Sequence, residues 1–493
     1  MMNNNSFNLI DEKWIITVDC GLVSLRQIFT DKSIKRLGGT VIEKLSVFKL
    51  LLAIAQAAYT PENDDEWYKY TSETMSSVIC DYLDRYHDRF YLFSENPFLQ
   101  FTEIKNLGKK ILKPYSTIQP YVASGNNTIR TQSEVSFHLE NSEIARLLVA
   151  QMNFAFGGKQ VDNSIVLTDG YKKSESGKVG IGLSYLGYLF SYFLGKNLID
   201  TVRLNLLTKE NVKETNMFPS GIGVAPWEKL PKGEDDEIAR TYKGSLLSRL
   251  VSLGRFTLME KDGLYLTEGL LYQDHKDGVG DPAITMDKSK KDIKVIWADP
   301  EKKPWRSFPS ILSFITLTDK NIICYQLYLC RKRFISYKGL SGIWSCGQKV
   351  SSNSGEFRVS GRDEGVDSVV FFDSADILSD SWYDMYSREI SSLEKLAYAL
   401  QKSIEGYLDD LNKSKESAKQ SMRGFWECIE PFSDDIANYC ADSDQTRRKN
   451  LRRLFSQIAV QCYDGACSCE TANQFCAWSE HRLSTYKYEH EGE

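Results

Sequence analysis

Four thiols and one imidazole lie close together near the end of the sequence, at Cys462, Cys467, Cys469, Cys476 and His481. Thiolate and imidazole groups are the usual protein ligands of zinc, so these residues could form a metal site. Their spacing, C-x4-C-x-C-x6-C-x4-H, differs from the paired-ligand patterns of zinc-binding proteins. Reduced cysteines packed between helices are the alternative, and we predict that arrangement, without a metal or another cofactor.

Motifs for hydrolytic chemistry are missing from the sequence. It contains no phosphate-binding loop, no G-x-S-x-G elbow and no H-E-x-x-H helix. The acidic pair Asp363–Glu364 could serve a metal-dependent nuclease. Adjacent strand residues point to opposite faces, however, so a solvated strand end is the alternative for this pair. We therefore predict that the protein is not an enzyme.

Two short segments could instead contact a nucleic acid. In "AFGGK" at 155–159, Gly157 and Gly158 would let the backbone approach a ligand closely, with the charge of Lys159 beside it. A helix C-cap is the alternative for this glycine pair. The basic run "RRKNLRR" at 447–453 could bind phosphates or could form the solvated face of a helix.

A third segment, "GIWSCGQKVSSNSGEFRVSGRDEG" at 342–365, is rich in glycine and serine and then alternates apolar and polar residues. The pattern predicts two strands joined by a small polar tip. Such a hairpin is either a solvated loop or a projection that inserts into a ligand.

Composition limits the classes of protein to consider. With 493 residues, 42% of them apolar, the chain is globular and has room for roughly two to four domains. The net charge of −5 gives no overall attraction to nucleic acid, and residues 380–493 alone carry −6, so contact with a polyanion must use local patches. Eleven irregularly spaced cysteines and the lack of a signal-peptide pattern predict a cytoplasmic protein. The most apolar run, 47–59, contains Lys49 and predicts a core helix and not a membrane span.

The predicted elements divide the chain near residue 378. Before it, the patterns predict a hairpin and helix over 7–29, helices over 41–58, 64–90 and 142–156, and strands over 198–208 and 254–269. After it, the patterns predict four helices, over 380–411, 414–440, 443–463 and 468–488. We expect an α+β protein in which a mixed α/β N-terminal domain, 1–378, precedes an antiparallel four-helix bundle, 379–493.

Seven segments, in this order, resemble the large subunit of the type I-E CRISPR surveillance complex Cascade, the CasA family. They are "FNLIDEKWI", "LLLAIAQAA", "NPFLQF", the glycine pair after a helix, "LNLLT", "PWRSFPSIL" and "GIWSCGQKVSSNSGE". The resemblance spans nearly the whole chain and includes the helical C-terminal domain. It implies a non-catalytic subunit that recognises the protospacer-adjacent motif (PAM) as duplex DNA from the minor groove. It also implies that this subunit wedges the duplex open for crRNA pairing in an R-loop.

The resemblance also implies partners and contact residues. The partners are the backbone and small Cascade subunits with their crRNA, double-stranded target DNA, and a nuclease-helicase. The implied contacts are a groove loop at Gly157, Gly158 and Lys159; a groove-reaching lysine at Lys276, with His275 as a second option; a wedge hairpin with Gln348, Lys349, Ser351, Ser352, Asn353 and Ser354; and a loop near the crRNA and PAM with Asn126, Asn127 and Arg130.

The sequence departs from the family pattern in three respects. The family has more glycine in the groove loop, where this sequence has Ala155 and Lys159. The wedge glutamine of the family is not at the hairpin tip; Gln348 lies at its base and Asn353 is the replacement at the tip. A cysteine cluster that binds zinc in some members is absent, since residues 81–323 contain no cysteine. A nuclease that uses Asp363 and Glu364, and a scaffold that binds only protein, stay open as alternatives.

Overall fold

The computed structural model describes residues 7–107, 112–119, 138–155, 182–272, 280–289, 291, 293–312, 322–353, 356–359, 365–372, 379–442 and 445–490. Within it the chain forms two compact units. The first comprises residues 1–300 and 320–368, and the second comprises 301–319 and 369–493. The mixture of helices and strands, with helices at the C-terminal end, confirms the predicted α+β class.

The second unit takes up a segment that the sequence assigns to the N-terminal domain. The hydroxyl of Tyr386 donates a hydrogen bond to the carbonyl oxygen of Trp305 at 2.8 Å. The ring of Trp305 also lies edge-on to that of Trp426, with 6.0 Å between the ring centroids. These contacts join residues 301–319 to the helical unit, whereas the sequence predicts a single boundary at residue 378.

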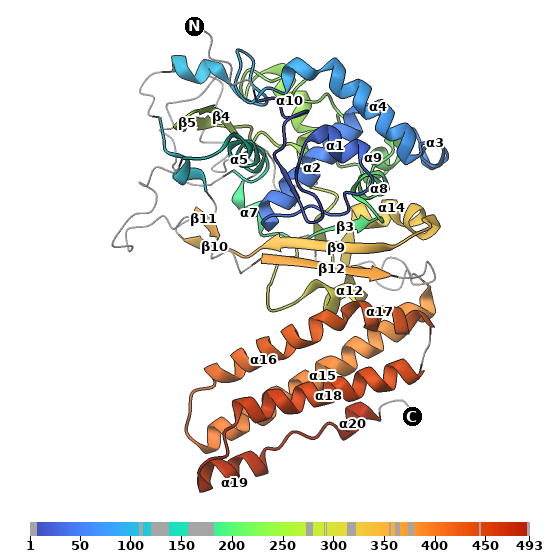
Figure 1. The fold of residues 1–493 in the computed structure, drawn as a ribbon, viewed down its shortest axis with the longest axis vertical. Helices are drawn as coiled ribbons and strands as arrows, with labels where there is room; N and C mark the ends of the chain where they lie inside the picture. Colours follow the sequence, from blue (N-terminus) through green and yellow to red (C-terminus); the bar gives the residue numbers. More distant parts are fainter. Residues whose placement is uncertain are drawn as a thin grey trace. The chain divides into compact units, whose positions relative to one another are not determined.

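The first unit contains mostly short elements (Figure 1). Its helices are α1 (Leu25–Thr30), α2 (Val41–Ala58), α3 (Asp64–Lys69), α4 (Ser72–Arg85), α5 (Asn141–Asn153), α7 (Leu183–Leu186), α8 (Leu198–Leu204), α9 (Lys209–Thr215), α10 (Glu237–Lys243), α11 (Leu247–Leu250) and α14 (Tyr325–Ser336). Its strands are β1 (Ile15–Thr17), β2 (Gly21–Val23), β3 (Phe190–Leu194), β4 (Arg255–Glu260), β5 (Gly263–Glu268), β6 (Thr285–Asp287), β7 (Lys294–Val295), β8 (Ile322–Cys324), β9 (Ser341–Gln348), β10 (Val350–Asn353) and β11 (Glu356–Val359), and it shares β12 (Gly365–Phe372) with the second unit.

Helix α2 is the central helix of the first unit. It begins at a capping box in which Thr40 and Glu43 exchange side-chain and backbone hydrogen bonds. Its residues are apolar on nearly every side, and it packs against α4, α5, α8, α11 and β9. A helix that is apolar all round is buried, as the sequence predicts for this run. Lys49 is an exception to the apolar character and lies buried in the middle of the helix.

A three-stranded sheet of order β12–β9–β3 lies beside α2. Strand β3 pairs antiparallel with β9, so that Phe190 is opposite Cys346 and Leu194 is opposite Gly342. Along its other edge β3 bonds to the segment before β6, because the Ser191 amide donates to the Ala283 carbonyl at 2.9 Å. All eight residues of β9 are buried, which is typical of a central strand.

Several predicted elements are confirmed, and two differ in the structure. The single helix predicted over 64–90 is divided into α3 and α4, because Thr71 caps the start of α4. The hairpin β1–β2 forms where the pattern predicts it, and the predicted strand region 254–269 forms the paired strands β4 and β5. Residues 198–208, predicted as a strand, instead begin with helix α8, because Asn197 caps the helix by accepting a hydrogen bond from the Asp200 amide at 2.9 Å. Its branched apolar residues suit a strand as well as a buried helix, so periodicity alone does not separate the two.

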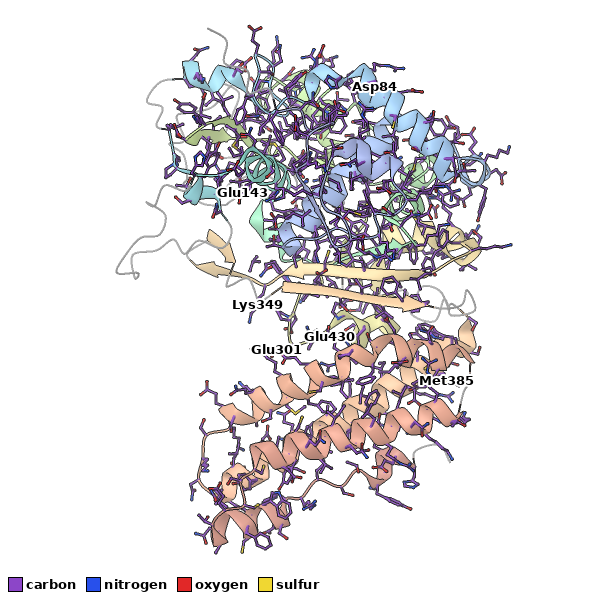
Figure 2. All side chains as sticks on the ribbon, in the orientation of Figure 1. Asp84, Glu143, Glu301, Lys349, Met385 and Glu430 are labelled. Atoms are coloured by element: carbon purple, nitrogen blue, oxygen red, sulfur yellow. The ribbon has the colours of Figure 1, made fainter. Side chains whose placement is uncertain are left out.

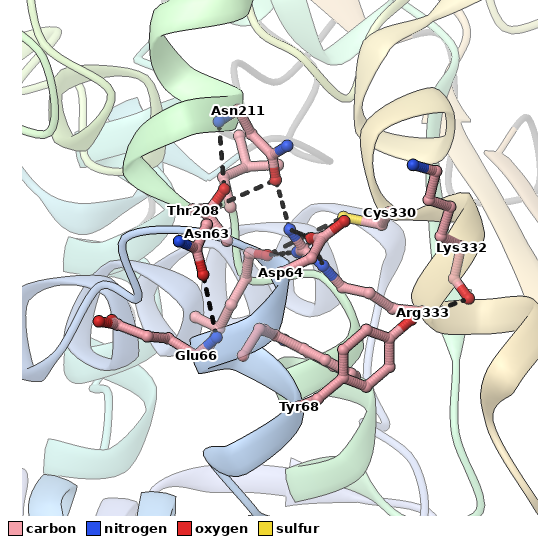
Figure 3. Close-up of polar contacts among 12 residues, drawn as sticks. Asn63, Asp64, Glu66, Tyr68, Thr208, Asn211, Cys330, Lys332 and Arg333 are labelled. Carbon is pink, nitrogen blue, oxygen red and sulfur yellow. Dashed lines mark hydrogen bonds and ion pairs between the residues drawn. The ribbon is translucent and has the colours of Figure 1, made fainter.

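A buried arginine ties together three helices of the first unit (Figure 3). Arg333 on α14 donates to the carboxylate of Asp64 on α3 at 2.7 Å and to the side chain of Asn211 on α9. Asn211 also takes part in the capping box at the start of α9. The guanidinium is therefore paired and hydrogen-bonded, which offsets the cost of burying its charge.

The second unit is helical after β12. Its elements are η6 (Pro304–Ser307), α12 (Phe308–Ile311), α15 (Asp380–Asp410), α16 (Glu416–Ile429), η9 (Glu430–Phe432), α17 (Ser433–Asp442), α18 (Gln445–Ala466), α19 (Ala472–Glu480) and α20 (Tyr486–Glu489). Helices α15, α16 and α18 lie alongside one another and pack pairwise (Figure 1).

Two of the four helices predicted here are each divided in the structure. Pro431 lies in the 3-10 turn η9, which separates α16 from α17, because proline cannot donate the backbone hydrogen bond of a continuing helix. The last predicted helix is divided into α19 and α20. The predicted break at Asn412 is confirmed, since this residue has φ 52°, the left-handed conformation that ends helices. In the described part of the chain, no helix is both long enough and apolar enough to span a membrane.

Candidate nucleic-acid interface

Most of the predicted contact residues lie outside the described residues. The described residues on either side give the positions at which their segments begin and end. These residues are Asn126, Asn127, Arg130, Gly157, Gly158, Lys159, His275, Lys276 and Ser354, together with the acidic pair Asp363 and Glu364. The structure describes Gln348 and Lys349 with their side chains, and the backbone of Ser351, Ser352 and Asn353.

The predicted hairpin is present as a separate two-stranded sheet, β10–β11. Its register pairs Val350 with Val359 and Asn353 with Glu356, which leaves two residues for the connection. The first predicted strand is therefore two strands, since β9 ends at Gln348 and β10 starts at Val350. Gln348 is fully buried whereas Lys349 is exposed, and Figure 2 shows Lys349 where the chain passes from β9 to β10. Gln348 therefore belongs to the support of the hairpin.

The base of the hairpin is closely packed at Gly187. A methyl group added there would lie 2.5 Å from Cγ2 of Val350 and 2.6 Å from Cζ3 of Trp297, both far inside van der Waals contact. Helix α7 packs against both β10 and β11. Glycine is needed at position 187 because β10, the Trp297 ring and the end of α7 all lie against its backbone.

The end of strand β9 is packed equally tightly. A methyl group added at Gly347 would clash with the carbonyl oxygen of Tyr188 and would lie 2.7 Å from Cβ of Ala298. The Ala298 amide donates to the Gly187 carbonyl at 2.8 Å, and the Leu189 amide donates to the Ile296 carbonyl at 2.9 Å. The hairpin thus starts from a rigid support, which a projection needs in order to exert force on a ligand.

The ends of the segment that contains the glycine pair lie beside β3. Ala155, the last described residue before it, forms a parallel bridge with Gly182, the first described residue after it. The ring of Phe154 lies edge-on to that of Phe190 on β3, with 6.1 Å between centroids. From Gly182 the chain continues directly into α7, which packs against the hairpin.

The segment that contains Lys276 also ends next to β3. It runs from Tyr272, whose hydroxyl donates to the Ser252 carbonyl at 2.7 Å, to Gly280. The next residue, Asp281, forms an ion pair with Lys49 at 2.6 Å. The Lys49 ammonium also lies 5.7 Å from the ring centroid of Phe154 and 5.2 Å from that of Phe190.

Lys49 therefore joins the ends of two segments that are far apart in sequence. It contacts Phe154, just before the glycine pair, and Asp281, just after the segment of Lys276. Both contacts lie against β3, whose partner strand β9 leads into the hairpin. Three of the four predicted contact segments, those of the glycine pair, of Lys276 and of the hairpin, thus start or end beside β3 or its partner strand.

A second buried cation lies near the same ends. The guanidinium carbon of Arg249 lies 4.6 Å from the ring centroid of Tyr272, and its nitrogen atoms have no hydrogen-bond partner among the described residues. Burial lowers the pKa of this guanidinium, while the nearby charge of Asp281 acts in the opposite direction. Tyr272 supplies a π face in place of a hydrogen-bond acceptor.

The basic run at 447–453 is largely used inside the second unit. Arg448 and Arg452 both donate to the carboxylate of Glu389 on α15, at 2.7 and 2.9 Å, and Arg447 contacts Asp435. Burial would lower the pKa of Arg452, but the hydrogen bonds and charge of Glu389 outweigh it and raise that pKa. The run therefore serves helix packing, and only part of it faces solvent.

The cysteine cluster does not assemble a metal site. His481 hydrogen-bonds to the carboxylate of Asp410 at 2.9 Å and packs against Gly406. Burial raises the pKa of the Cys467 thiol to about 12, which keeps it protonated. No group of three or more His, Cys, Asp or Glu residues in the described ranges could hold a metal ion.

The residues that support the predicted contacts were not predictable as such from the sequence. Lys49 has a core-helix pattern on both sides, and its only signal is a charge inside an apolar run. Trp297 lies in a stretch rich in charge, "KDIKVIWADPEKK". The only signal for structure there is a short alternation of polar and apolar residues around β7. Neither signal identifies which distant residue it meets.

Residues 8–462 match the family described as CRISPR-associated protein Cse1. The chain belongs to the Cse1 family. A curated relative, the CRISPR-associated protein CasA/Cse1 of Thermus thermophilus, is 29% identical to it over 216 residues. That alignment covers 41% of this chain, and the chain thus spans 39% of the length of this Cse1 relative.

Solved structures of Cse1 proteins have the same fold over almost the whole chain. Cse1 of Thermobifida fusca superposes with a TM-score of 0.75 at 20% identity, covering 98% of each chain. A chain of a CRISPR RNA-guided surveillance complex superposes with a TM-score of 0.65 at 15% identity, covering 98% of this chain and 99% of that one. At these identities the likeness establishes the fold. The family match over residues 8–462 confirms the resemblance found in the sequence.

Proposed function

We propose that this Cse1 protein is the large, non-catalytic subunit of an RNA-guided DNA-surveillance complex and that its first unit recognises the PAM duplex and starts its opening. The observation that carries the proposal is the meeting of three segment ends around β3, two of them joined by Lys49 and the third by the pairing of β9 with β3. Family membership and the fold shared with a chain of a surveillance complex support the assembly with other subunits and crRNA.

The chemistry of the three segments suits the minor groove. That groove is too narrow for a helix and carries few base-specific donors and acceptors, so thin backbone and single long side chains suit it best. We assign Gly157 and Gly158, with Lys159, to the approach of backbone to the groove, and Lys276, or His275, to a side chain that enters it. Asn126, Asn127 and Arg130 are assigned to the loop near the crRNA and PAM.

The hairpin β10–β11 is assigned to strand separation. Breaking the first base pair costs a few kcal/mol of stacking and pairing, so a wedge needs a rigid base. The tight packing at Gly187 and Gly347 provides that base. Residues Lys349, Ser351, Ser352, Asn353 and Ser354 form the wedge in this proposal, with Gln348 as its buried support.

The second unit is proposed to present a surface to partner proteins, among them the nuclease-helicase. Its net negative charge disfavours contact with DNA, and three arginines of its basic run are ion-paired. The competing possibility of a metal-dependent nuclease can be tested by incubating the protein with DNA and Mg²⁺ or Mn²⁺. We expect the DNA to stay intact.

The assignment of the glycine pair is tested with Gly158→Asp in the assembled complex. A carboxylate there would repel phosphates and block close approach of the backbone, so we expect affinity for PAM-bearing duplex to fall by about tenfold or more. The measurement is a binding titration with duplexes that carry or lack the PAM. Gly424→Asp on α16, where an added methyl group meets nothing within 4 Å, adds the same charge in the second unit as a control. Equal affinity of the Gly158 variant and the parent, with assembly intact, would reject the groove role.

A further inference from the structure

We propose that the indole ring of Trp297 is a stacking platform for an unpaired base of the target duplex next to the PAM. The proposal deepens the function above and rests on it, because it needs a duplex that opens at the hairpin. It adds a binding residue from a part of the chain that the predicted contacts do not include.

The ring is held in place by its neighbours, yet nearly half of the side chain is exposed. Trp297 is 45% exposed, although Gly187 approaches its six-membered ring closely and the ring of Tyr188 meets it edge-on with 4.9 Å between centroids. The main chain around it is fixed by a bridge between Tyr188 and Trp297 and by the Ala298 hydrogen bond to Gly187. A ring that is already ordered loses little conformational entropy when a ligand stacks on it.

The ring lies at the base of the hairpin. Gly187 is the common neighbour, since a methyl group there would meet both Trp297 and Val350, the first residue of β10. In this proposal, a base freed beside the hairpin reaches the exposed part of the indole at the hairpin base. Among the exposed large apolar side chains in the described residues of the first unit, Trp297 is the only tryptophan, which has the largest π face.

The chemistry of the site favours a nucleobase over an apolar protein side chain. Every base has a π face and can stack on an aromatic ring, so stacking needs no particular sequence. An exposed lysine lies close in sequence to each of the two residues that meet Gly187. Lys294 is three residues before Trp297, and Lys349 is one residue before Val350. Their charges favour a ligand that carries phosphates beside its aromatic groups.

Photocrosslinking of the unmodified protein tests the proposal directly. A target duplex carries 5-iodo-deoxyuridine at the first base pair beyond the PAM, on one strand or the other, and is irradiated in the assembled complex. Iodinated uracil couples to aromatic side chains that it touches. We expect a crosslinked peptide that contains Trp297 with one of the two strands, and no such peptide with a duplex that lacks the PAM.

Variants give the energetic test. Trp297→Ala should slow R-loop formation on a fully paired target by roughly fivefold to 150-fold, the range of stacking effects per base. Trp297→Phe should keep most of the rate, because it keeps a ring. Tyr398→Ala on α15 removes a side chain that is 62% exposed in the second unit and should leave the rate unchanged. Thermal unfolding of each variant checks that the first unit still folds.

A fluorescent base separates stacking from mere support of the fold. With 2-aminopurine at the first base pair, opening unstacks the base and raises its fluorescence, while stacking on an indole lowers it again. We expect a brighter signal per R-loop with Trp297→Ala than with the parent.

The outcomes distinguish this inference from the proposed function. An R-loop that forms normally with the parent, without a crosslink at Trp297 and with equal brightness in the alanine variant, would overturn the platform and leave PAM recognition standing. A parent complex that forms no R-loop on a PAM-bearing target would overturn both.

Discussion

Lys49 and Asp281 form an ion pair of 2.6 Å inside the first unit, where their side chains are only 3% and 5% exposed. Lys49 comes from the middle of the core helix α2, and Asp281 follows the segment that contains Lys276. The same ammonium contacts the rings of Phe154 and Phe190. The pair thus makes the stability of the core and the position of the proposed DNA-contacting segments depend on the same contact.

Lys49→Met should destabilise the first unit strongly. Removing one partner of a buried ion pair leaves the other charge uncompensated, which costs about 3–5 kcal/mol in the free energy of unfolding. Adding Asp281→Asn should restore part of that loss, because the charge is gone and the amide oxygen can still accept the Ala283 amide hydrogen bond that Asp281 accepts at 2.9 Å. Urea unfolding of parent, single variants and double variant measures the coupling. Strictly additive effects would mean that the pair does not act as one unit.

Thiol reactivity should follow burial. Burial raises the pKa of Cys324 to about 12 and that of Cys330 to about 11, so both thiols stay protonated and unreactive between about pH 7 and 9. The exposed cysteines should react first with a thiol-specific reagent in the folded protein; these are Cys20, Cys428, Cys469 and Cys476. Mass spectrometry of the labelled peptides identifies which thiols reacted.

The control for thiol labelling is the unfolded protein, in which all eleven cysteines should react. Early labelling of Cys324 or Cys330 in the folded protein would contradict the burial argument. Protection of Cys469 and Cys476, lifted by a chelator, would instead revive the zinc site considered from their spacing.

Local patterns could be predicted from the sequence, but long-range contacts could not. The helical period of 41–58 and the short alternation around 15–23 depend on neighbouring residues, and both predictions are confirmed by α2 and the β1–β2 hairpin. The strand predicted at 198–208 is wrong because its apolar residues fit either element, and the cap at Asn197 decides for a helix. The helix predicted over 414–440 fails for a similar reason. Pro431 ends α16, but the chain continues as helix α17 in the same unit.

The candidate interface was predictable only in part. Glycine and serine content indicated the hairpin, which is confirmed as β10–β11. The packing of Val350 and Trp297 on Gly187 joins residues that are about 110 to 160 positions apart, and no local pattern predicts it. The roles of Gly157, Gly158, Lys159 and Lys276 stay predictions.

Lys276→Ala should reduce both the affinity of the complex for PAM-bearing duplex and its dependence on salt. Each phosphate neutralised by a cation contributes about one unit to the slope of log affinity against log salt, so a lysine at the duplex should lower that slope by about one when removed. Binding titrations at several salt concentrations provide the slope. Lys402→Ala, which removes a lysine paired with Glu405 in the second unit, is the matched control. An unchanged slope would remove Lys276 from the interface and direct attention to His275.

The wedge role predicts a defect that depends on whether the target is already open. Replacing Ser351 to Ser354 by Gly-Gly should leave the fold intact, because β10–β11 is a separate sheet and the pairing of β9 with β3 does not include it. Initial contact with the PAM should persist in part, since the glycine pair and Lys276 lie elsewhere in the sequence. Strand separation should fail, because the wedge acts when the first base pair must break before guide pairing can compensate.

The size of this defect follows from the balance of R-loop formation. In another RNA-guided effector the exchange of duplex for heteroduplex is nearly balanced, so the cost of the first step is not recovered early. Losing about 2–3 kcal/mol there should slow opening roughly 30- to 150-fold. A target with mismatches beside the PAM is already open and should restore the rate of the variant to that of the parent. The measurement is R-loop formation on paired and mismatched targets, and equal defects on both, or none on either, would mean that the hairpin is only a solvated loop.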